Sequence, residues 1–185
     1  MAASQKEIEL VKACQQNDRQ AQNAFYNLYK GRLMGVCRRY ARTLAEAEDI
    51  FQEAFIKIFQ HLGSLQNPES VTYWVKSTVI RTAIDYYRQH RNESEQVNYA
   101  EILEEWSTRP TVYDQLTQEE VLKVINEMPN GYRVVANLFY IDGYTHQEIA
   151  QMLDIAEGTS KSQLARAREI LKKKLKAMGL WAITL

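Results

Sequence analysis

A cluster of polar and basic side chains lies near the end of this 185-residue chain. The segment EGTSKSQLARAREILKKKLK, residues 157–176, holds seven Lys or Arg residues against two Glu, although the whole chain balances 23 Lys and Arg against 23 Asp and Glu. Its start supplies hydrogen-bonding side chains, which are Thr159, Ser160, Lys161, Ser162 and Gln163. Arg166 follows, and Lys172–Lys174 can neutralise phosphates. These residue types read base edges and bind phosphate, so the segment predicts nucleic-acid recognition.

A second set of side chains recurs at intervals of four, three, four and three residues, which places its members on one helix face. The set is Trp74, Thr78, Arg81, Asp85 and Arg88. An aromatic ring, a hydroxyl and two guanidinium groups can stack on single-stranded bases and hold their phosphates. We expect Asp85 to orient an arginine. For Trp74, a place in the core is an equally good interpretation.

A third set, Asp49, Gln52, Glu53 and Ile56, shares the face opposite an apolar stripe. A solvated acidic face would explain the carboxylates but not the isoleucine. An exposed Ile beside polar residues therefore favours a protein interface.

Enzyme chemistry is not indicated. His61, His90 and His146 are isolated, and no grouping of nucleophile, base and orienting residue is present. No Cys or His spacing fits a zinc site, and no glycine-rich phosphate loop occurs. We therefore predict a binding protein that is not an enzyme and needs no cofactor or metal.

The elements that must position these residues are helices. Thr43, Thr117 and Thr145 each stand three residues before Glu, which is the capping-box signature of a helix start. Apolar periodicity predicts eight helices, over 5–16, 19–41, 44–61, 69–91, 118–127, 130–141, 146–153 and 157–178. No stretch alternates as a strand would, so the predicted fold class is all-α.

An acidic stretch without a helical pattern separates two blocks of helices. Residues 92–120 carry eight acidic residues and only Arg109 as a basic one, so their balance is 1 − 8 = −7. We predict two small helical domains, 1–91 and 115–185, joined by an acidic linker at 92–114. A short surface helix in this stretch is the alternative.

The last two predicted helices form a helix-turn-helix. A capped helix over 146–153 is followed by a break at Asp154-Ile155 and a second helix with Leu164, Ala167, Leu171 and Leu175 on one face. In this motif the start of the second helix enters the major groove of DNA. A solvated terminal helix is the alternative, but it explains only the lysines at the end.

The remaining composition is that of a soluble globular chain. No apolar run approaches the ~18–20 residues that span a bilayer, and the first ten residues do not resemble a signal peptide. We expect a cytoplasmic protein whose two cysteines, Cys14 and Cys37, are reduced and buried.

Two stretches resemble the extracytoplasmic-function (ECF) sigma factors, small bacterial transcription initiation factors of the sigma-70 family. MPNGYRVVANLFYIDGYTHQEIAQMLDIAEGTSKSQLARAREIL is similar to their region 4. Residues 24–91 are similar to region 2, through DIFQEAFIKIF at 49–59 and YWVKSTVIRTAIDYYRQHR at 73–91.

The resemblance implies a factor that binds core RNA polymerase and directs it to promoters. Region 4 would read a −35 element as duplex, and region 2 would capture a −10 element as it melts. The family's polymerase contact corresponds to Asp49, Gln52, Glu53 and Ile56. Its −10 contacts correspond to Asn67, Ser70, Trp74, Thr78, Arg81 and Arg88. Its −35 contacts correspond to Arg133, Thr159, Ser160, Lys161, Ser162, Gln163 and Arg166.

Several residues depart from the family pattern and imply a promoter preference of their own. Ser160 replaces a usual Val, Asp154 a usual turn Gly, and Gln163 a usual Arg. Arg81 stands where Asn is common, and Ala165 is smaller than the usual residue.

Two alternatives stay open, namely an autonomous dimeric helix-turn-helix regulator and a helical interaction module with a charged tail. Family members are often held inactive by an anti-sigma factor, but no residue of this sequence indicates one.

Overall fold

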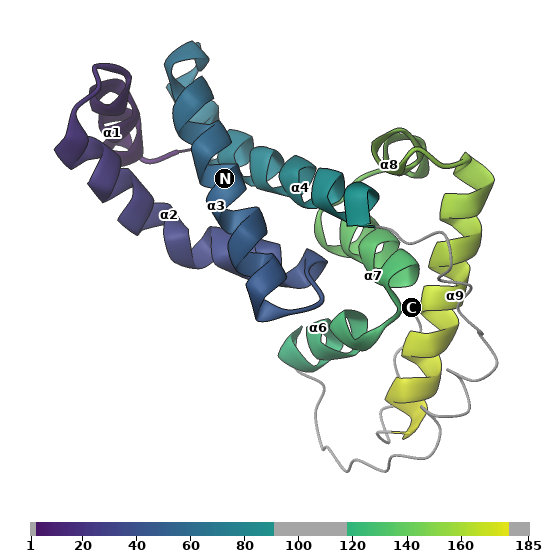
Figure 1. Cartoon of the computed structure of the whole chain (residues 1–185). Helices are drawn as coiled ribbons and strands as arrows, with labels where there is room; N and C mark the ends of the chain where they lie inside the picture. Colours follow the sequence, from purple (N-terminus) through teal and green to yellow (C-terminus); the bar gives the residue numbers. More distant parts are fainter. Residues whose placement is uncertain (1–2, 91–117, 178–185) are drawn as a thin grey trace. The chain divides into compact units, whose positions relative to one another are not determined.

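The computed structural model describes residues 3–90 and 118–177 of the chain. Every regular element within these ranges is helical (Figure 1), which confirms the predicted all-α class. The chain divides into two compact units, Met1–His90 and Arg91–Leu185. The predicted acidic linker at 92–114 and the capping box at Thr117 lie outside the described residues.

The first unit packs four α-helices with two short 3-10 turns. They are α1 Gln5–Gln15, α2 Arg19–Tyr40, α3 Leu44–His61, η1 Leu62–Ser64, η2 Pro68–Ser70 and α4 Val71–His90. The predicted helix at 69–91 thus begins two residues later, because η2 precedes it. Proline at the start of that turn has the fixed φ that suits a first helical position.

The N-terminus of α1 is tied to the core through one carboxylate. Ser4 and Glu7 form a capping box, in which the Ser4 amide donates to Glu7 Oε2 at 2.8 Å. The other oxygen of Glu7 accepts from the Tyr29 hydroxyl at 3.0 Å. Tyr29 is almost fully buried, and desolvation raises the pKa of its phenol to about 12. The cap therefore also satisfies a buried hydroxyl of α2.

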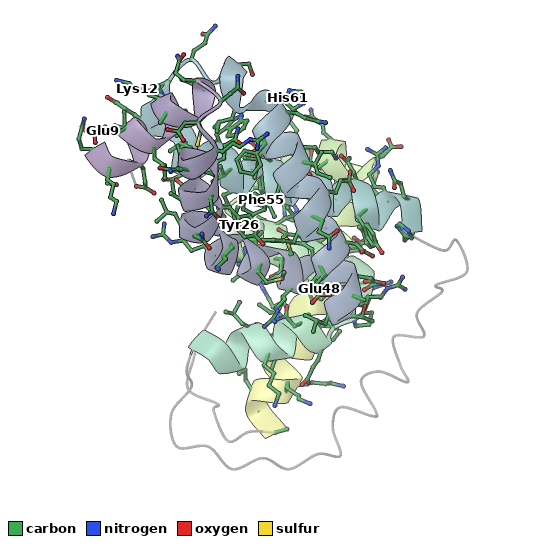
Figure 2. All side chains as sticks on the ribbon, turned by 60° about the vertical axis from the view of Figure 1, so that its left-hand side comes forward. Glu9, Lys12, Tyr26, Glu48, Phe55 and His61 are labelled. Carbon is green, nitrogen blue, oxygen red and sulfur yellow. The ribbon has the colours of Figure 1, made fainter. Side chains whose placement is uncertain are left out.

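Aromatic rings fill the space between α2 and α3. Tyr26 and Phe55 lie against each other (Figure 2), and their ring centroids are 4.8 Å apart. Phe51 and Phe55 lie at the same separation, and Phe25 contacts Phe59 at 6.0 Å. Such tilted pairs add about 0.5–1.5 kcal/mol each beyond the area that they bury.

Both cysteines are free and buried, as predicted. Desolvation raises the pKa of the Cys14 thiol to about 11 and that of the Cys37 thiol to about 12. Since the thiolate is the reactive form, these groups act as small apolar side chains.

One predicted capping box forms only in part. The Thr43 hydroxyl accepts from the Glu46 amide at 3.1 Å, as expected. The Glu46 carboxylate, however, accepts from the backbone amide of Arg42 at 2.7 Å and from its guanidinium at 3.2 Å. The attraction of Arg42 explains why the carboxylate binds one residue before the cap.

The described part of the second unit, residues 118–177, contains four α-helices and one π-helical turn. They are α6 Gln118–Glu127, α7 Asn130–Ala136, η3 Asn137–Ile141, α8 His146–Leu153 and α9 Glu157–Ala177. The predicted helix at 130–141 is therefore confirmed in its extent, but its second half is π-helical rather than α-helical. The Asp142 amide bonds to the Asn137 carbonyl at 3.0 Å, which is the five-residue spacing of a π turn. Gly143, with φ of 78°, then redirects the chain towards α8.

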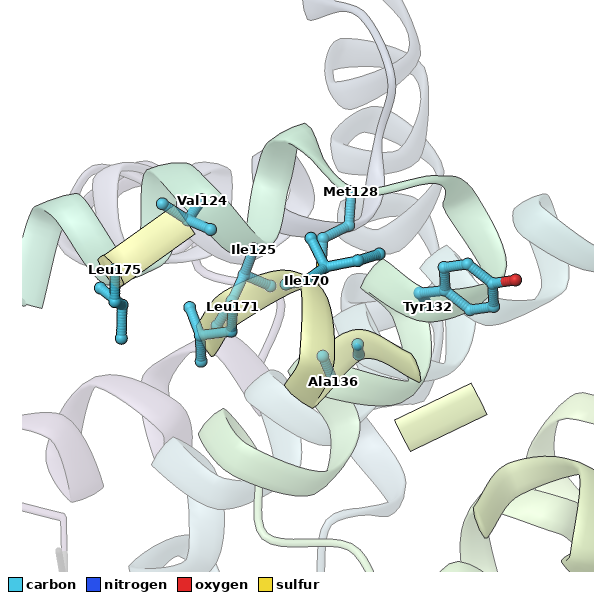
Figure 3. Packing of buried hydrophobic residues seen from close by; sticks show 9 residues of the cluster. Val124, Ile125, Met128, Tyr132, Ala136, Ile170, Leu171 and Leu175 are labelled. Carbon is cyan, nitrogen blue, oxygen red and sulfur yellow. The ribbon is translucent and has the colours of Figure 1, made fainter. Parts of the chain in front are cut away.

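The core of the second unit joins α9 to α6 and α7 (Figure 3). Its members are Val124, Ile125, Met128, Tyr132, Ala136, Ala167, Ile170, Leu171 and Leu175. The predicted apolar stripe of α9 is confirmed, because Leu164, Ala167, Leu171 and Leu175 are all buried. Burial of each large side chain contributes about 1.5–3 kcal/mol, which fixes which face of α9 remains exposed.

Candidate functional site

The outer face of α3 presents the polar residues and the isoleucine that the sequence placed together. Asp49, Gln52, Glu53 and Ile56 are all exposed, and Ile56 keeps 57% of its surface in contact with solvent. Lys57 lies 2.7 Å from the Glu53 carboxylate. The opposite face buries Ala47, Ile50, Phe51, Ala54, Phe55 and Ile58. Ile56 therefore stays exposed beside acidic residues, because a separate face of α3 already supplies the side chains that pack in the core.

The row along α4 is half-buried at its start and exposed towards its end. Trp74 is half-buried, so it belongs fully neither to the core nor to the surface, and Arg81 and Arg88 are exposed. The Thr78 hydroxyl donates to the Trp74 carbonyl at 2.9 Å, which leaves its oxygen as an acceptor. The Asp85 carboxylate lies 3.8 Å from Lys57 of α3, and this contact joins the row to the neighbouring helix.

Tyr73 is an exposed aromatic residue outside the sets predicted from the sequence. It is 69% exposed, the largest fraction among the large apolar side chains that the structure describes. It directly precedes Trp74, at the first turn of α4. Its position off the predicted row explains why helical spacing did not reveal it.

The turn before α4 uses two predicted site residues to build its own geometry. Asn67 Oδ1 accepts from the Glu69 amide at 3.0 Å, and the Ser70 hydroxyl donates to the Asn67 carbonyl at 2.7 Å. Asn67 is exposed, and its side-chain nitrogen retains donors for a ligand.

The helix-turn-helix forms as predicted around Asp154. Thr145 and Glu148 make a complete capping box at the start of α8. Asp154 adopts the left-handed region, with φ of 53° and ψ of 55°, and the Ile155 amide bonds back to the Ala150 carbonyl at 3.1 Å. Asp tolerates this region better than most residues. The tight turn therefore forms although glycine is absent.

The first turns of α9 present most of the predicted DNA-contacting side chains to solvent. Thr159, Lys161, Ser162 and Arg166 are exposed, whereas Gln163 is half-buried. Lys161 lies 2.7 Å from the Glu157 carboxylate, and this hydrogen bond lowers the pKa of Glu157.

Two arginines of α9 are held by tyrosine hydroxyls, one from α7 and one from the π turn η3. Arg166 Nη1 donates to Tyr132 Oη, and Arg168 Nε donates to Tyr140 Oη, both at 3.3 Å. Tyr132 is buried in the core cluster, so it is a fixed anchor for the Arg166 guanidinium. Sequence spacing does not reveal these pairs, because the two residues of each pair are 34 and 28 positions apart in the chain.

Three polar residues lie where a direct contact with DNA does not fit. Arg133 is only 5% exposed, and its Nη2 donates to Asn130 Oδ1 at 2.7 Å. Ser160 is completely buried, and Lys174 is 9% exposed with Glu127 at 3.8 Å. We therefore correct the expectation that Arg133 and Ser160 present contact groups on the surface, and that Lys174 neutralises phosphate.

Two further findings concern only the described parts of the chain. No helix there is long and apolar enough to span a membrane. No group of three or more His, Cys, Asp or Glu side chains is placed there to hold a metal ion.

Comparison with known families and proteins gives matches over both units. The model of Sigma-70 region 2 matches residues 25–93, and that of Sigma-70 region 4 matches residues 118–171. The ECF RNA polymerase sigma-E factor of Haemophilus influenzae is 25% identical over 189 residues, which cover 96% of this chain and 100% of the relative. The ECF RNA polymerase sigma factor SigW of Bacillus subtilis is 28% identical over 181 residues, covering 90% and 95%.

A solved structure, that of CnrH in complex with the cytosolic domain of CnrY, resembles the chain with a TM-score of 0.51 and 19% identity. The alignment covers 92% of this chain and 97% of that chain. At this identity the likeness concerns the fold alone.

Proposed function

Since the chain belongs to the ECF sigma factors of the sigma-70 family, we propose that it binds core RNA polymerase and directs it to specific promoters. The observation that carries the proposal is the order of two separate matches, region 2 and then region 4, with relatives aligned along almost the whole chain. Core RNA polymerase and the bacterial chromosome are both in the cytoplasm, so the proposal implies that the protein acts there.

The polymerase contact is assigned to the outer face of α3. Asp49, Gln52, Glu53 and Ile56 are exposed together there. An apolar side chain surrounded by polar ones suits an interface that is formed and later released, because it is stable in water before binding. The carboxylates would add orientation and speed of encounter rather than most of the affinity.

The −10 element is assigned to α4 and the turn before it. Arg81 and Arg88 are exposed for phosphate contact, and Trp74 and Tyr73 offer rings for stacking. Separating a base pair forfeits stacking of about 1.4 kcal/mol per step. Stacking of a base on an aromatic side chain contributes about 1–3 kcal/mol. One or two captured bases therefore offset much of the local cost of melting.

The −35 element is assigned to the start of α9. Thr159, Lys161 and Ser162 are exposed on its first turns, and Arg166 lies one turn further on. Small hydroxyls allow close approach to base edges, whereas lysine and arginine reach bases or phosphates. The Tyr132 hydroxyl limits the freedom of Arg166 before DNA arrives, which lowers the entropy lost on binding.

Regulation by an anti-sigma factor is a further part of this proposal, taken from the family. No described residue identifies such a partner.

Run-off transcription tests the proposed function. The purified chain is added to core polymerase with a library of duplex promoters, and the transcripts are sequenced. We expect initiation above the level of core polymerase alone, from templates that share two elements at a fixed spacing. No increase on any template, together with tight binding of the chain alone to palindromic duplexes, would favour the autonomous regulator instead.

A further inference from the structure

Ser160 is a buried polar residue in the middle of an otherwise exposed turn. Its neighbours Thr159 and Lys161 face solvent, whereas Ser160 is 0% exposed. Its hydroxyl lies 2.9 Å from Nδ1 of His146, the first residue of α8. A buried hydroxyl without a partner is costly. The hydrogen bond therefore connects the two helices of the helix-turn-helix at the turn that is assigned to DNA.

The His146 ring is itself fixed from two further directions. Its backbone follows Thr145, whose capping box with Glu148 sets the first turn of α8. Phe139 stacks on the ring, with centroids 4.8 Å apart and an interplanar angle of 26°. Phe139 belongs to the π-helical turn η3. The orientation of the His146 ring, and with it the hydrogen bond to Ser160, therefore depends on α8, η3 and α9 together.

Apolar packing alone does not provide this constraint. The buried stripe of α9 decides which face is inside, but burial of apolar area is non-directional. A hydrogen bond at 2.9 Å weakens steeply when its angle changes, so it resists rotation of the helix start. Thr159 and Lys161 flank Ser160, and any rotation there moves both.

We propose that His146 and Ser160 are positioning residues for −35 recognition. Their hydrogen bond sets the orientation of the first turn of α9 and thereby the sequence preference of Thr159, Lys161 and Ser162. This inference rests on the proposed function of α9 in reading the −35 element. Neither residue needs to touch DNA.

Four variants separate positioning from simple loss of stability. His146→Phe retains an aromatic ring for Phe139 but removes the hydrogen bond and leaves the Ser160 hydroxyl buried without it. Ser160→Ala removes the buried hydroxyl, and the double variant removes both partners. His146→Asn is the conservative rescue, since its amide can place a hydrogen-bonding atom near the position of Nδ1.

The readout is run-off transcription from two sets of templates. One set varies the −35 element around the sequence that the wild-type chain prefers, and the other varies the −10 element. We expect His146→Phe to lower transcription from the preferred −35 sequence about fivefold, the factor for one lost buried hydrogen bond. The ratios among −10 variants should stay unchanged.

The double variant should resemble Ser160→Ala rather than show the product of the single effects, because no unpaired hydroxyl remains. His146→Asn should restore most of the wild-type preference. If the variants lower thermal stability but leave the ratios among −35 sequences unchanged, the residues are merely structural and the inference is wrong. Additive single effects would also overturn it.

The wild-type chain distinguishes this failure from failure of the proposed function. Promoter-dependent initiation by wild type, with ratios that the variants do not alter, refutes only the positioning role. A wild-type chain that is silent on every promoter refutes the proposed function and the inference with it.

Discussion

Replacement of Ile56 by alanine tests the polymerase-binding face of α3 with little disturbance of the fold. The side chain is 57% exposed, so its truncation opens no cavity in the core. Alanine is the better helix former, and the helix should therefore remain intact.

The expected magnitude follows from the exposed part of the side chain. Full burial of an isoleucine contributes about 1.5–3 kcal/mol. Only the 57% that faces solvent is available to a partner, and alanine retains Cβ. The loss of binding free energy is thus about 1 kcal/mol, which raises the dissociation constant for core polymerase about fivefold.

Leu44→Ala is the matched control, because Leu44 is 55% exposed on the same helix but lies outside the proposed face. Fluorescence anisotropy of chain labelled at its N-terminus, titrated with core polymerase, gives both affinities. Thermal unfolding checks that each variant is folded. Binding by Ile56→Ala within twofold of wild type, or an equal loss for Leu44→Ala, would refute the assigned interface.

Three further predictions concern α9, the buried thiols and the cap of α1. Lys161→Ala combined with Arg166→Ala should lower −35-dependent transcription at least tenfold while sparing binding to core polymerase, since each base or phosphate contact is worth about 1–3 kcal/mol. Cys14 and Cys37, with thiol pKa values raised to about 11 and about 12, should react with a thiol reagent at pH 8 only after denaturant is added. Glu7→Gln should reduce the free energy of unfolding at pH 7 by less than about 1 kcal/mol, and urea titrations should show the difference vanishing in acid.

The direction of the pH effect follows from the hydrogen bonds of Glu7. Its pKa lies below the ordinary 4.5, chiefly because the Ser4 backbone amide donates to it. A carboxylate with a depressed folded-state pKa contributes stability above the unfolded pKa, and this contribution is lost as pH falls through the folded value. A difference that persists unchanged at pH 2 would contradict this origin.

The control for the α9 variant removes the same charge elsewhere. Lys172→Ala with Lys176→Ala takes two positive charges from exposed positions of α9. It should weaken binding uniformly across sequences and reduce the salt dependence, without a change in −35 preference. If this control lost −35-dependent transcription equally and in a sequence-selective way, the result would count against recognition of the −35 element by the first turn of α9.

Much of the fold was predictable because its signals are local. Thr145 with Glu148 marks the start of α8, and the spacing of Leu164 and Leu171 marks the inner face of α9. The π turn at 137–141 was not predictable, because it ends the helical segment and no later turn follows in which the changed register would show in the apolar pattern. The partner of Glu46 was also not predictable, because the capping-box motif assigns its carboxylate to the Thr43 amide and takes no account of the competing Arg42 guanidinium.

The candidate site was less predictable, because residue type and helical position indicate different environments for three of its residues. Ser160 stands four residues before Leu164 and seven before Ala167, so its spacing already places it on the buried stripe. Lys174 likewise follows Leu171 by three residues. Arg133 lies within a run from Tyr132 to Leu138 that is buried throughout. Helical spacing could have found all three, whereas the tyrosine partners of the arginines depend on tertiary packing.

Reactivity of thymines towards permanganate on a promoter duplex is the most direct measurement, because it reports unpaired bases. Core polymerase alone and the chain alone should leave the duplex unreactive, whereas both together should expose thymines within the −10 element. Arg81→Ala with Arg88→Ala should reduce that signal while retaining protection of the −35 duplex. Thymines that stay unreactive with both proteins, or that become reactive with the chain alone, would contradict a factor that opens promoters only on the polymerase.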